Sequence, residues 1–290
     1  MDRYTIAELE KLTGIKTGTI RIWERRYRII KPHRTDTNRR WYDDDDLIRI
    51  INISILYRHG FKISKIASMT GAEITRQVAL LTEETTDTDT QLDSLVVAMT
   101  DFNEKAINEN LMRSIINRGF EETFEKIVFP FLRRVGVMWQ TGTIDIGAEH
   151  FMTNIFRKRM IVATDSLPHP DSPDRKKVLL YLPESELHEM GLLFFAFVVR
   201  KEGHDTLYLG QSTPFNAMAD VVARWNPDII ITGSLTGLPY ERPEDYLKRM
   251  SAVFRDKKIL VSGAMARAAN GKTLANVFAV TSVTELKKHL

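Results

Sequence analysis

The chain of 290 residues contains no cysteine, and it also has no long hydrophobic run. The lack of cysteine excludes disulfide bonds, thiolate metal ligands and cysteine nucleophiles, and it fits a protein of the reducing cytoplasm. No run of 18 apolar residues occurs, and the first residues, MDRYTIAELEKLTG, are polar and amphipathic. We therefore expect a cytoplasmic protein with neither a membrane span nor a signal peptide.

Short motifs of common catalytic sites are absent as well. The sequence has no GxGxxG segment of a dinucleotide-binding fold, no HExxH segment of a zinc protease, and no Ser/His/Asp set at a recognisable spacing. Residues 270–273, NGKT, contain the GKT of a phosphate-binding loop, but Ala266 stands where that loop requires its first glycine. We therefore expect that the protein is not an enzyme.

Positive charge is concentrated in the N-terminal part of the chain. The net charge is only +3, yet residues 1–80 carry more Lys and Arg than Asp and Glu, whereas the rest carries a slight acidic excess. A small basic unit in front of a larger, mildly acidic body is typical of a polyanion-binding domain attached to a second function.

The segment TIAELEKLTGIKTGTIRIWERRY shows two short amphipathic stretches separated at Gly14, with Thr5 and Thr17 as the expected helix N-caps. This pattern predicts a helix-turn-helix, whose second helix projects far enough to enter a DNA major groove about 12 Å wide. The turn-rich stretch that follows predicts a small β-wing, and Asp43 to Asp46 favour the start of the next helix.

We assign residues 1–80 to a winged-helix domain that binds double-stranded operator DNA. Side chains at the start of the second helix are expected in the major groove, and wing side chains at phosphates or the minor groove. The first group is Thr17, Thr19 and Arg21, and the second is Arg34, Arg39, Arg40 and Tyr42. A single small domain makes few phosphate contacts, so useful affinity requires a homo-oligomer, a dimer or tetramer, on repeated sites.

Residues 81–91, LTEETTDTDTQ, show no apolar periodicity, so we interpret them as a solvated linker. Residues 92–167 show helical periodicity without strand alternation and predict a four-helix bundle. Pro130 is expected to interrupt one of these helices, and Gly119 and Gly142 stand where helices should end.

A second linker, residues 168–175, is rich in proline and charge. In residues 176–290, short apolar runs rich in β-branched residues, KKVLLYLP, DTLYLG, DIIITGS, KKILVSG and VFAV, alternate with helical stretches. The alternation predicts a flavodoxin-like, doubly wound domain with a five-stranded parallel sheet. The whole chain is therefore expected to be a multidomain α and α/β protein.

His188 is one of only seven histidines, and its position is unusual. It lies in PESELHEMG, residues 183–191, directly after the first expected strand, where a doubly wound sheet binds its ligands. The strands that end in GS at 233–234 and in SGA at 262–264 carry small residues, which leave room for a flat or long ligand. From His188 alone, the alternative is a surface histidine that caps a helix.

These positions resemble the motifs of cobalamin-binding domains. Glu186, His188 and Gly191 match the E/DxHxxG box of such domains, and Ser234 with the leucine after it resembles their SxL box. The later double glycine of these domains appears here only as Gly263 followed by alanine.

The preceding segments carry two further resemblances. Trp139, followed after nine residues by Glu149 and His150, is similar to the Trp-x9-Glu-His element of the helical bundle that caps adenosylcobalamin. Residues 4–69, with TIRIWERRY and the RRWY wing, resemble a MerR-type winged helix. Three such domains in this order resemble the CarH/LitR family of B12-dependent photoreceptor repressors, over nearly the whole chain.

The resemblance implies that His188 is the lower axial ligand of cobalt, in place of the cofactor's own benzimidazole. That tail is then implied to lie buried in the sheet near Ser234 and Gly263. A neutral imidazole is a good nitrogen donor for cobalt, and its second nitrogen needs an orienting acceptor, a role that fits Glu186.

On the upper side, the resemblance implies that Trp139 packs over the adenosyl group and that Glu149 and His150 hydrogen-bond it. One position departs from the family. A histidine directly after the tryptophan can ligate cobalt in light-sensing members once light breaks the cobalt–carbon bond, but this chain has Gln140 there. Glutamine is a poor cobalt ligand, so a two-histidine photoproduct is not expected at this position.

We therefore expect a transcriptional repressor whose oligomerisation and operator binding are controlled by adenosylcobalamin, with light sensing as a further property that the resemblance implies. Two alternatives stay open. The first is a MerR-type regulator with a degenerate cobalamin domain controlled by a protein partner, which the departures at Gln140 and after Gly263 permit. The second is a cobalamin-dependent methyl carrier or mutase subunit, which does not need the basic N-terminal domain.

Overall fold

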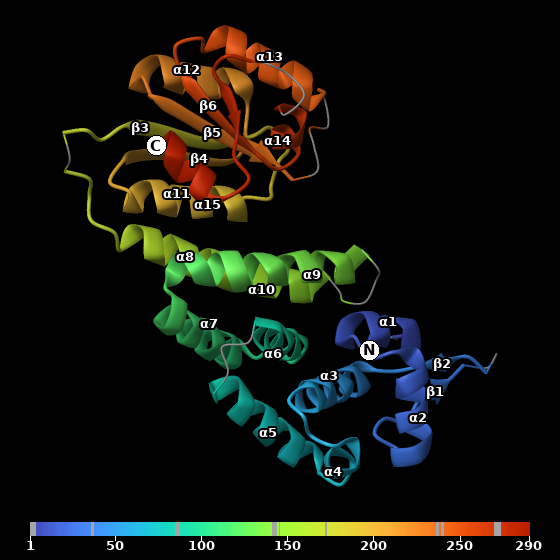
Figure 1. Cartoon of the computed structure of the whole chain (residues 1–290). Coiled ribbons are helices and arrows are strands. Elements are labelled where there is room, and N and C mark those ends of the chain that lie inside the picture. The colour runs from blue at the N-terminus through green and yellow to red at the C-terminus, as the bar shows by residue number, and fades with distance from the viewer. Residues whose placement is uncertain are drawn as a thin grey trace. The chain divides into compact units, whose positions relative to one another are not determined.

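The computed structural model describes residues 4–35, 38–84, 88–140, 144, 146–171, 173–235, 238, 241–269 and 274–290. The chain forms two compact units, Met1–Phe156 and Arg157–Leu290. The first unit contains the winged helix and most of the helical bundle, and the second contains the end of the last bundle helix and the parallel sheet (Figure 1).

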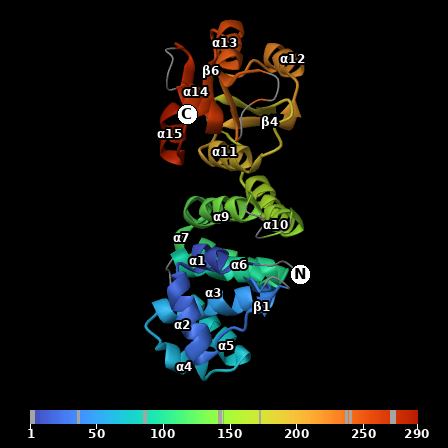
Figure 2. The ribbon, with the colours of Figure 1, turned by 90° about the vertical axis from the view of Figure 1, so that its right-hand side faces the viewer.

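The first unit begins with the predicted winged helix-turn-helix (Figure 2). Its elements are α1 (Ile6–Thr13), α2 (Thr17–Tyr27), β1 (His33–Arg34), β2 (Arg40–Trp41), α3 (Asp44–Arg58), α4 (Ile63–Ala67) and α5 (Gly71–Glu84). The two short strands pair antiparallel and form the wing, and the backbone of Tyr42 pairs with that of Tyr4 beside it.

Local sequence signals explain the ends of these helices. Thr5 caps α1 in a capping box with Glu8, and Gly14 ends this helix with a φ of 72°, a conformation that favours glycine. Asp43 caps α3 by accepting the backbone N–H of Asp46 at 2.9 Å. The predictions for these three ends are confirmed.

Thr17 is not the N-cap of α2, in contrast to our prediction. Lys16 holds the capping position, and its side chain makes no cap hydrogen bond. The backbone N–H of Thr17 donates instead to the carboxylate of Glu10 at 2.9 Å. A side chain of the preceding helix therefore satisfies this helix start, which a local pattern does not reveal.

The bundle consists of α6 (Thr88–Thr100), α7 (Glu104–Arg118), α8 (Phe120–Thr123), the π-helical turn η1 (Phe124–Val128), α9 (Phe129–Gln140) and α10 (Ile146–Asp165). Because α8, η1 and α9 follow one another without a break, they form one irregular helix. The prediction of four helices is confirmed.

Pro130 lies in the first turn of α9, directly after the π-helical turn. Proline has no N–H for the regular helical ladder, and the amide of Phe129 donates to the carbonyl of Phe124, five residues back. The predicted interruption is therefore confirmed. Gly119 ends α7 with a φ of 82°, also as predicted, whereas Gly142 lies outside the described residues.

The expectation of a solvated linker over residues 81–91 is wrong for residues 81–84, which end α5, and for residues 88–91, which begin α6. Thr90 and Gln91 are buried there, and the Thr90 hydroxyl lies 2.9 Å from Nε2 of His59 at the end of α3. A polar composition suggests solvent, but tertiary partners satisfy these polar groups inside the first unit. The domain boundaries stay predictions.

The second unit contains a five-stranded parallel sheet with the order β4-β3-β5-β6-β7. Its elements are β3 (Lys177–Pro183), α11 (Met190–Lys201), β4 (Asp205–Thr213), α12 (Phe215–Trp225), β5 (Ile229–Ser234), α13 (Pro243–Val253), β6 (Lys258–Ser262), α14 (Gly263–Ala269), β7 (Val277–Ala279) and α15 (Val283–His289). This order is that of flavodoxin-like folds, so the predicted fold class is confirmed.

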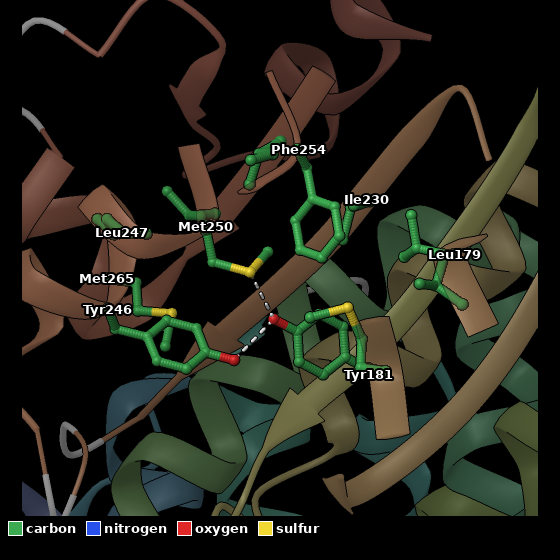
Figure 3. Packing of buried hydrophobic residues seen from close by; sticks show 12 residues of the cluster. Leu179, Tyr181, Ile230, Tyr246, Leu247, Met250, Phe254 and Met265 are labelled. Carbon is green, nitrogen blue, oxygen red and sulfur yellow. Dashed lines mark hydrogen bonds between the residues drawn. The ribbon is translucent and has the colours of Figure 1, made fainter. Parts of the chain in front are cut away.

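One face of the sheet packs against α12, α13 and α14 through a continuous apolar core (Figure 3). The hydroxyl of Tyr181 lies inside this core, 2.8 Å from the hydroxyl of Tyr246 and 3.2 Å from the sulfur of Met250. Burial raises the pKa of Tyr181 well above its ordinary value, so the hydroxyl stays protonated and donates. The opposite face is covered by α11 and α15 (Figure 1).

Candidate functional site

The loop after β3 places Glu186 and His188 at the carboxyl end of the sheet. Oε1 of Glu186 accepts the backbone N–H of His188 at 2.9 Å and lies 2.6 Å from Nδ1 of its ring. Oε2 accepts the backbone N–H of Leu235, after β5, at 2.8 Å. Glu186 is only 4% exposed, and it links the loop of His188 to the end of a neighbouring strand.

The charge of Glu186 determines the tautomer of His188. Burial alone raises the pKa of Glu186, but the hydrogen bonds from the backbone of His188 and Leu235 and from the His188 ring outweigh it. The pKa of Glu186 therefore lies below its ordinary value. An ionised carboxylate only accepts hydrogen bonds, so in the neutral ring of His188 Nδ1 carries the proton and Nε2 carries the lone pair.

Nε2 of His188 is available to a ligand. No hydrogen bond to Nε2 occurs among the described residues, and 57% of the side chain is exposed. The apolar side chains of Leu187 and Leu235 beside it are also exposed. An imidazole lone pair flanked by exposed apolar side chains fits a surface that receives a largely apolar ligand with a metal ion.

The ends of β5 and β6 form a close approach that requires glycine. A Cβ atom at Gly263 would lie 2.1 Å from the backbone oxygen of Ser234, and a Cβ atom at Gly233 would lie 2.2 Å from Oγ of Ser262. Gly263 also has a φ of +64°. Oγ of Ser234 is buried and has no hydrogen-bond partner among the described residues. An unsatisfied buried hydroxyl beside this glycine cradle fits a polar group of a ligand.

The residues of the predicted upper-ligand element lie on two consecutive helices of the bundle. Trp139 is half exposed near the end of α9, and the side chain of Gln140 lies outside the described residues. In the first turn of α10, Oε2 of Glu149 lies 2.6 Å from Nδ1 of His150, and Oε1 accepts the hydroxyl of Thr153 at 2.7 Å. Both residues therefore hold fixed side-chain positions while part of each stays exposed.

The predicted DNA-contacting side chains are mostly accessible. Arg21 is exposed on α2, and Thr17 and Thr19 are half-buried in its first turn. The exposed wing residues are Arg34, Arg39 and Arg40. Sequence reasoning missed three further exposed arginines at the end of α2, although the segment ERRYR signals them: Arg25, Arg26 and Arg28. These extend the basic surface of the helix.

Tyr42 is the exception, because its side chain is fully buried. Its hydroxyl donates to Glu24 of α2 at 3.1 Å, and burial together with Glu24 raises the pKa of Tyr42 well above its ordinary value. Glu24 also pairs with Arg40 of the wing at 3.5 Å. The expectation that Tyr42 contacts DNA is therefore wrong: it anchors the wing to α2, a role that depends on tertiary packing.

Two segments of the chain match known protein families. Residues 4–72 match the MerR HTH family of regulatory proteins, and residues 91–164 match the B12 binding domain. The chain is 30% identical to the HTH-type transcriptional repressor CarH of Myxococcus xanthus over 274 residues, which cover 91% of this chain and 90% of that protein. The chain belongs to the CarH family of transcriptional repressors.

One further relative and one solved structure are also similar to this chain. The HTH-type transcriptional repressor CarA of Myxococcus xanthus is 24% identical over 253 residues, covering 86% of this chain and 82% of that protein. The solved monomethylamine corrinoid protein of Methanosarcina barkeri is 14% identical, covers 70% of this chain and 98% of its own, and has a TM-score of 0.57. This second likeness shows a shared fold.

The CarH-family chain contains a charged group next to His188 that sequence reasoning missed. Glu189 is buried, and its carboxylate accepts Nε of Arg157 from α10 at 2.5 Å and the hydroxyl of Tyr208 from β4 at 2.8 Å. Its partners are far away in sequence, so only its position directly after His188 signals it. The ion pair between Arg157 and Glu189 therefore attaches α10 to the loop that carries His188.

Gly191, the glycine of the predicted ExHxxG box, lies in an open position. A Cβ atom at Gly191, in the first turn of α11, would meet no other atom within 4 Å, so protein packing alone does not require this glycine.

None of the helices in the described part of the chain combines the length and apolar character needed to cross a bilayer.

Proposed function

We propose that this chain is an operator-binding repressor whose DNA affinity is controlled by a cobalamin ligated through His188. The observation that carries the proposal is the hydrogen bond between Nδ1 of His188 and the buried carboxylate of Glu186. Carboxylates oriented in this way fix the tautomer of metal-binding histidines and raise their basicity. The Nε2 lone pair of His188 would therefore be suited to hold the cobalt of the cofactor.

The same edge of the sheet offers a place for the nucleotide tail of the cofactor. The buried hydroxyl of Ser234, which has no hydrogen-bond partner among the described residues, supports this placement, and Gly263 lies directly beside it where β5 and β6 approach closely. We also assign Gly191 to this site, because the space over it is open on the protein side.

The preferred form of the cofactor is adenosylcobalamin in this proposal. Trp139 stacks on the adenosyl group, and Glu149 and His150 hydrogen-bond it. Half-exposed Trp139 and the ordered Glu149–His150 pair support these roles. When bound, the cofactor supplies a cobalt–carbon bond that green light can break. Gln140 would offer the cobalt no imidazole, so this residue would not supply a second histidine ligand.

DNA binding uses the exposed basic surface of α2 and the wing. Arg21 enters the major groove with Thr17 and Thr19, while the wing arginines Arg34, Arg39 and Arg40 contact phosphates. One such domain makes few contacts, so repression requires a homo-oligomer that places several domains on one operator. The protein acts where operator DNA lies, which is the cytoplasm in this proposal.

An absorption titration tests cobalamin ligation. Apo protein is mixed with adenosylcobalamin in the dark, and the spectrum is compared for wild type, His188→Ala and the matched control His169→Ala, an exposed histidine. We expect coloured holo protein with a histidine-ligated spectrum for wild type and the control, and loss of that spectrum for His188→Ala. A colourless wild-type protein would favour the alternative of a degenerate domain controlled by a protein partner.

Measurements of molecular mass and DNA affinity test whether cobalamin controls oligomerisation and operator binding. The molecular mass and DNA affinity are measured for apo protein, for dark holo protein and for holo protein after green light. We expect a larger oligomer and higher affinity only in the dark holo sample, because a few kcal/mol of preference shift such an equilibrium almost completely. Coloured protein that binds no DNA in any state would favour a methyl carrier or mutase subunit.

A further inference from the structure

Asp93 of α6 is a buried charge at which three parts of the first unit meet. It is only 1% exposed, and its Oδ2 pairs with a guanidinium nitrogen of Arg58 at the end of α3. Its Oδ1 accepts Nη1 of Arg134, from α9, at 2.7 Å. Nη2 of Arg134 also donates to the carbonyl of Leu12, in α1, at 2.5 Å. The Asp93 carboxylate therefore joins α3 to the bundle, and Arg134 extends the link to α1.

We call Arg58, Asp93 and Arg134 the Asp93 cluster. Removing one partner of a buried ion pair leaves an uncompensated charge, so the arrangement with both arginines in place is strongly preferred. The contact between His59 and Thr90, one turn earlier on α6, lies beside it and fixes the same two helices. The winged helix is thus attached firmly to the bundle at this point.

The other end of α6 has the opposite character. Partial burial and, to a smaller extent, the carboxylate of Asp45 in α3 raise the pKa of Asp101 just after α6. A cavity of about 60 Å³ adjoins this end and is lined by Tyr4, Asp44 and Phe102 among others. Ion pairs therefore hold the winged helix to the bundle at one end of α6, whereas a small cavity lies between them at the other end.

Helix α9 carries both Arg134 of the Asp93 cluster and Trp139, which we assign to the cofactor site. Arg134 and Trp139 lie five residues apart on this helix, so they move together when it shifts or rotates. In the attached arrangement the DNA-contacting side chains Arg21, Arg34 and Arg39 remain exposed. Attachment to the bundle therefore leaves these three side chains accessible.

We propose that the Asp93 cluster couples α9 to the winged helix and thereby transmits the cobalamin state to the DNA-contacting surface. This inference rests on the proposed function, because it names the internal route of that regulation. With the cluster intact, the winged helices of an oligomer hold a fixed orientation and bind repeated sites together. Without it, each winged helix turns freely, and the gain from simultaneous binding falls.

The test compares Arg134→Met with Arg133→Met, its exposed neighbour on α9. DNA is selected from a random-sequence pool by the wild-type holo protein, and its affinity is measured with and without adenosylcobalamin at one salt concentration. We expect at least a roughly tenfold gain on cofactor addition for wild type and Arg133→Met, and less than about twofold for Arg134→Met. The cobalamin spectrum and the holo oligomer mass of Arg134→Met should match wild type.

A distance measurement provides a second readout, since the chain has no cysteine of its own. Spin labels are placed at Ser64→Cys in α4 and Lys105→Cys in α7, both exposed. We expect one narrow distance distribution in wild type and Arg133→Met and a broad one in Arg134→Met, or in Asp93→Asn if Arg134→Met fails to fold. A wild-type protein without a cofactor response overturns the proposed function. A wild-type response that Arg134→Met retains in full overturns this inference.

Discussion

Replacing Glu186 with alanine leaves three hydrogen-bond donors without their acceptor: the backbone N–H groups of His188 and Leu235, and Nδ1 of His188. Water reaches the partly exposed ring, so the two backbone groups account for most of the loss. An unsatisfied buried donor costs about 1–3 kcal/mol, so we expect the free energy of unfolding of the apo protein to fall by about 2–4 kcal/mol. Urea unfolding measures this change.

The same substitution should weaken cobalamin binding, because the imidazole of His188 loses the group that orients it. Loss of such a partner reduces metal affinity by about 10–100-fold. An absorption titration with cobalamin gives this value directly. Glu186→Gln keeps the shape of the side chain but brings an amide N–H group against one of the donors, so it should lie between wild type and Glu186→Ala.

The pH dependence of stability checks the charge of Glu186. Its pKa is lowered in the folded protein, so its contribution is complete above the ordinary glutamate pKa of about 4.3 and is lost as the pH falls through the folded-state value. The stability difference between wild type and Glu186→Gln should therefore be constant near neutral pH and shrink in acid. Exposed Glu184→Gln is the control. If Glu186→Ala bound cobalamin as tightly as wild type does, the proposed role of Glu186 in orienting His188 would be refuted.

Three other substitutions test separate parts of the structure. Gly263→Ala should lower the free energy of unfolding by about 2–5 kcal/mol, measured by urea unfolding, because the new Cβ meets the backbone oxygen of Ser234 and the φ of +64° is strained. Arg21→Ala should weaken binding to selected DNA by about 1–3 kcal/mol, measured by fluorescence anisotropy. Tyr246→Phe should cost about 1 kcal/mol in thermal unfolding, because the buried hydroxyl of Tyr181 loses one partner.

Matched controls separate these effects from general damage. Gly191→Ala meets open space and should leave apo stability unchanged while it weakens cobalamin binding. Arg255→Ala removes an exposed arginine of the second unit and should leave DNA affinity unchanged. Equal stability of Gly263→Ala and Gly191→Ala would contradict the close approach of β5 and β6, and equal DNA affinity of Arg21→Ala and Arg255→Ala would contradict the role of α2.

Periodicity and local signals were sufficient for most of the fold. The capping box at Thr5, the left-handed glycine at Gly14 and the interruption near Pro130 depend on residues close in sequence, so a local pattern reveals them. The alternation of apolar runs and helical stretches likewise predicts the parallel sheet, because strand and helix periods differ. The polar composition of residues 81–91 was misleading, since composition reports hydrophilicity and not the presence of buried partners.

The sequence by itself determined the order of domains, the elements within them and the position of His188 at the carboxyl end of a strand. Tertiary structure alone decided that Tyr42 is buried, that Asp93 joins two arginines, and that the Glu186 carboxylate reaches the backbone of Leu235, 49 residues later in the chain. The physical reason is that burial, ion pairing and hydrogen bonding depend on groups brought together by folding. Such partners leave no local pattern, whereas helix caps and strand alternation arise within a few residues.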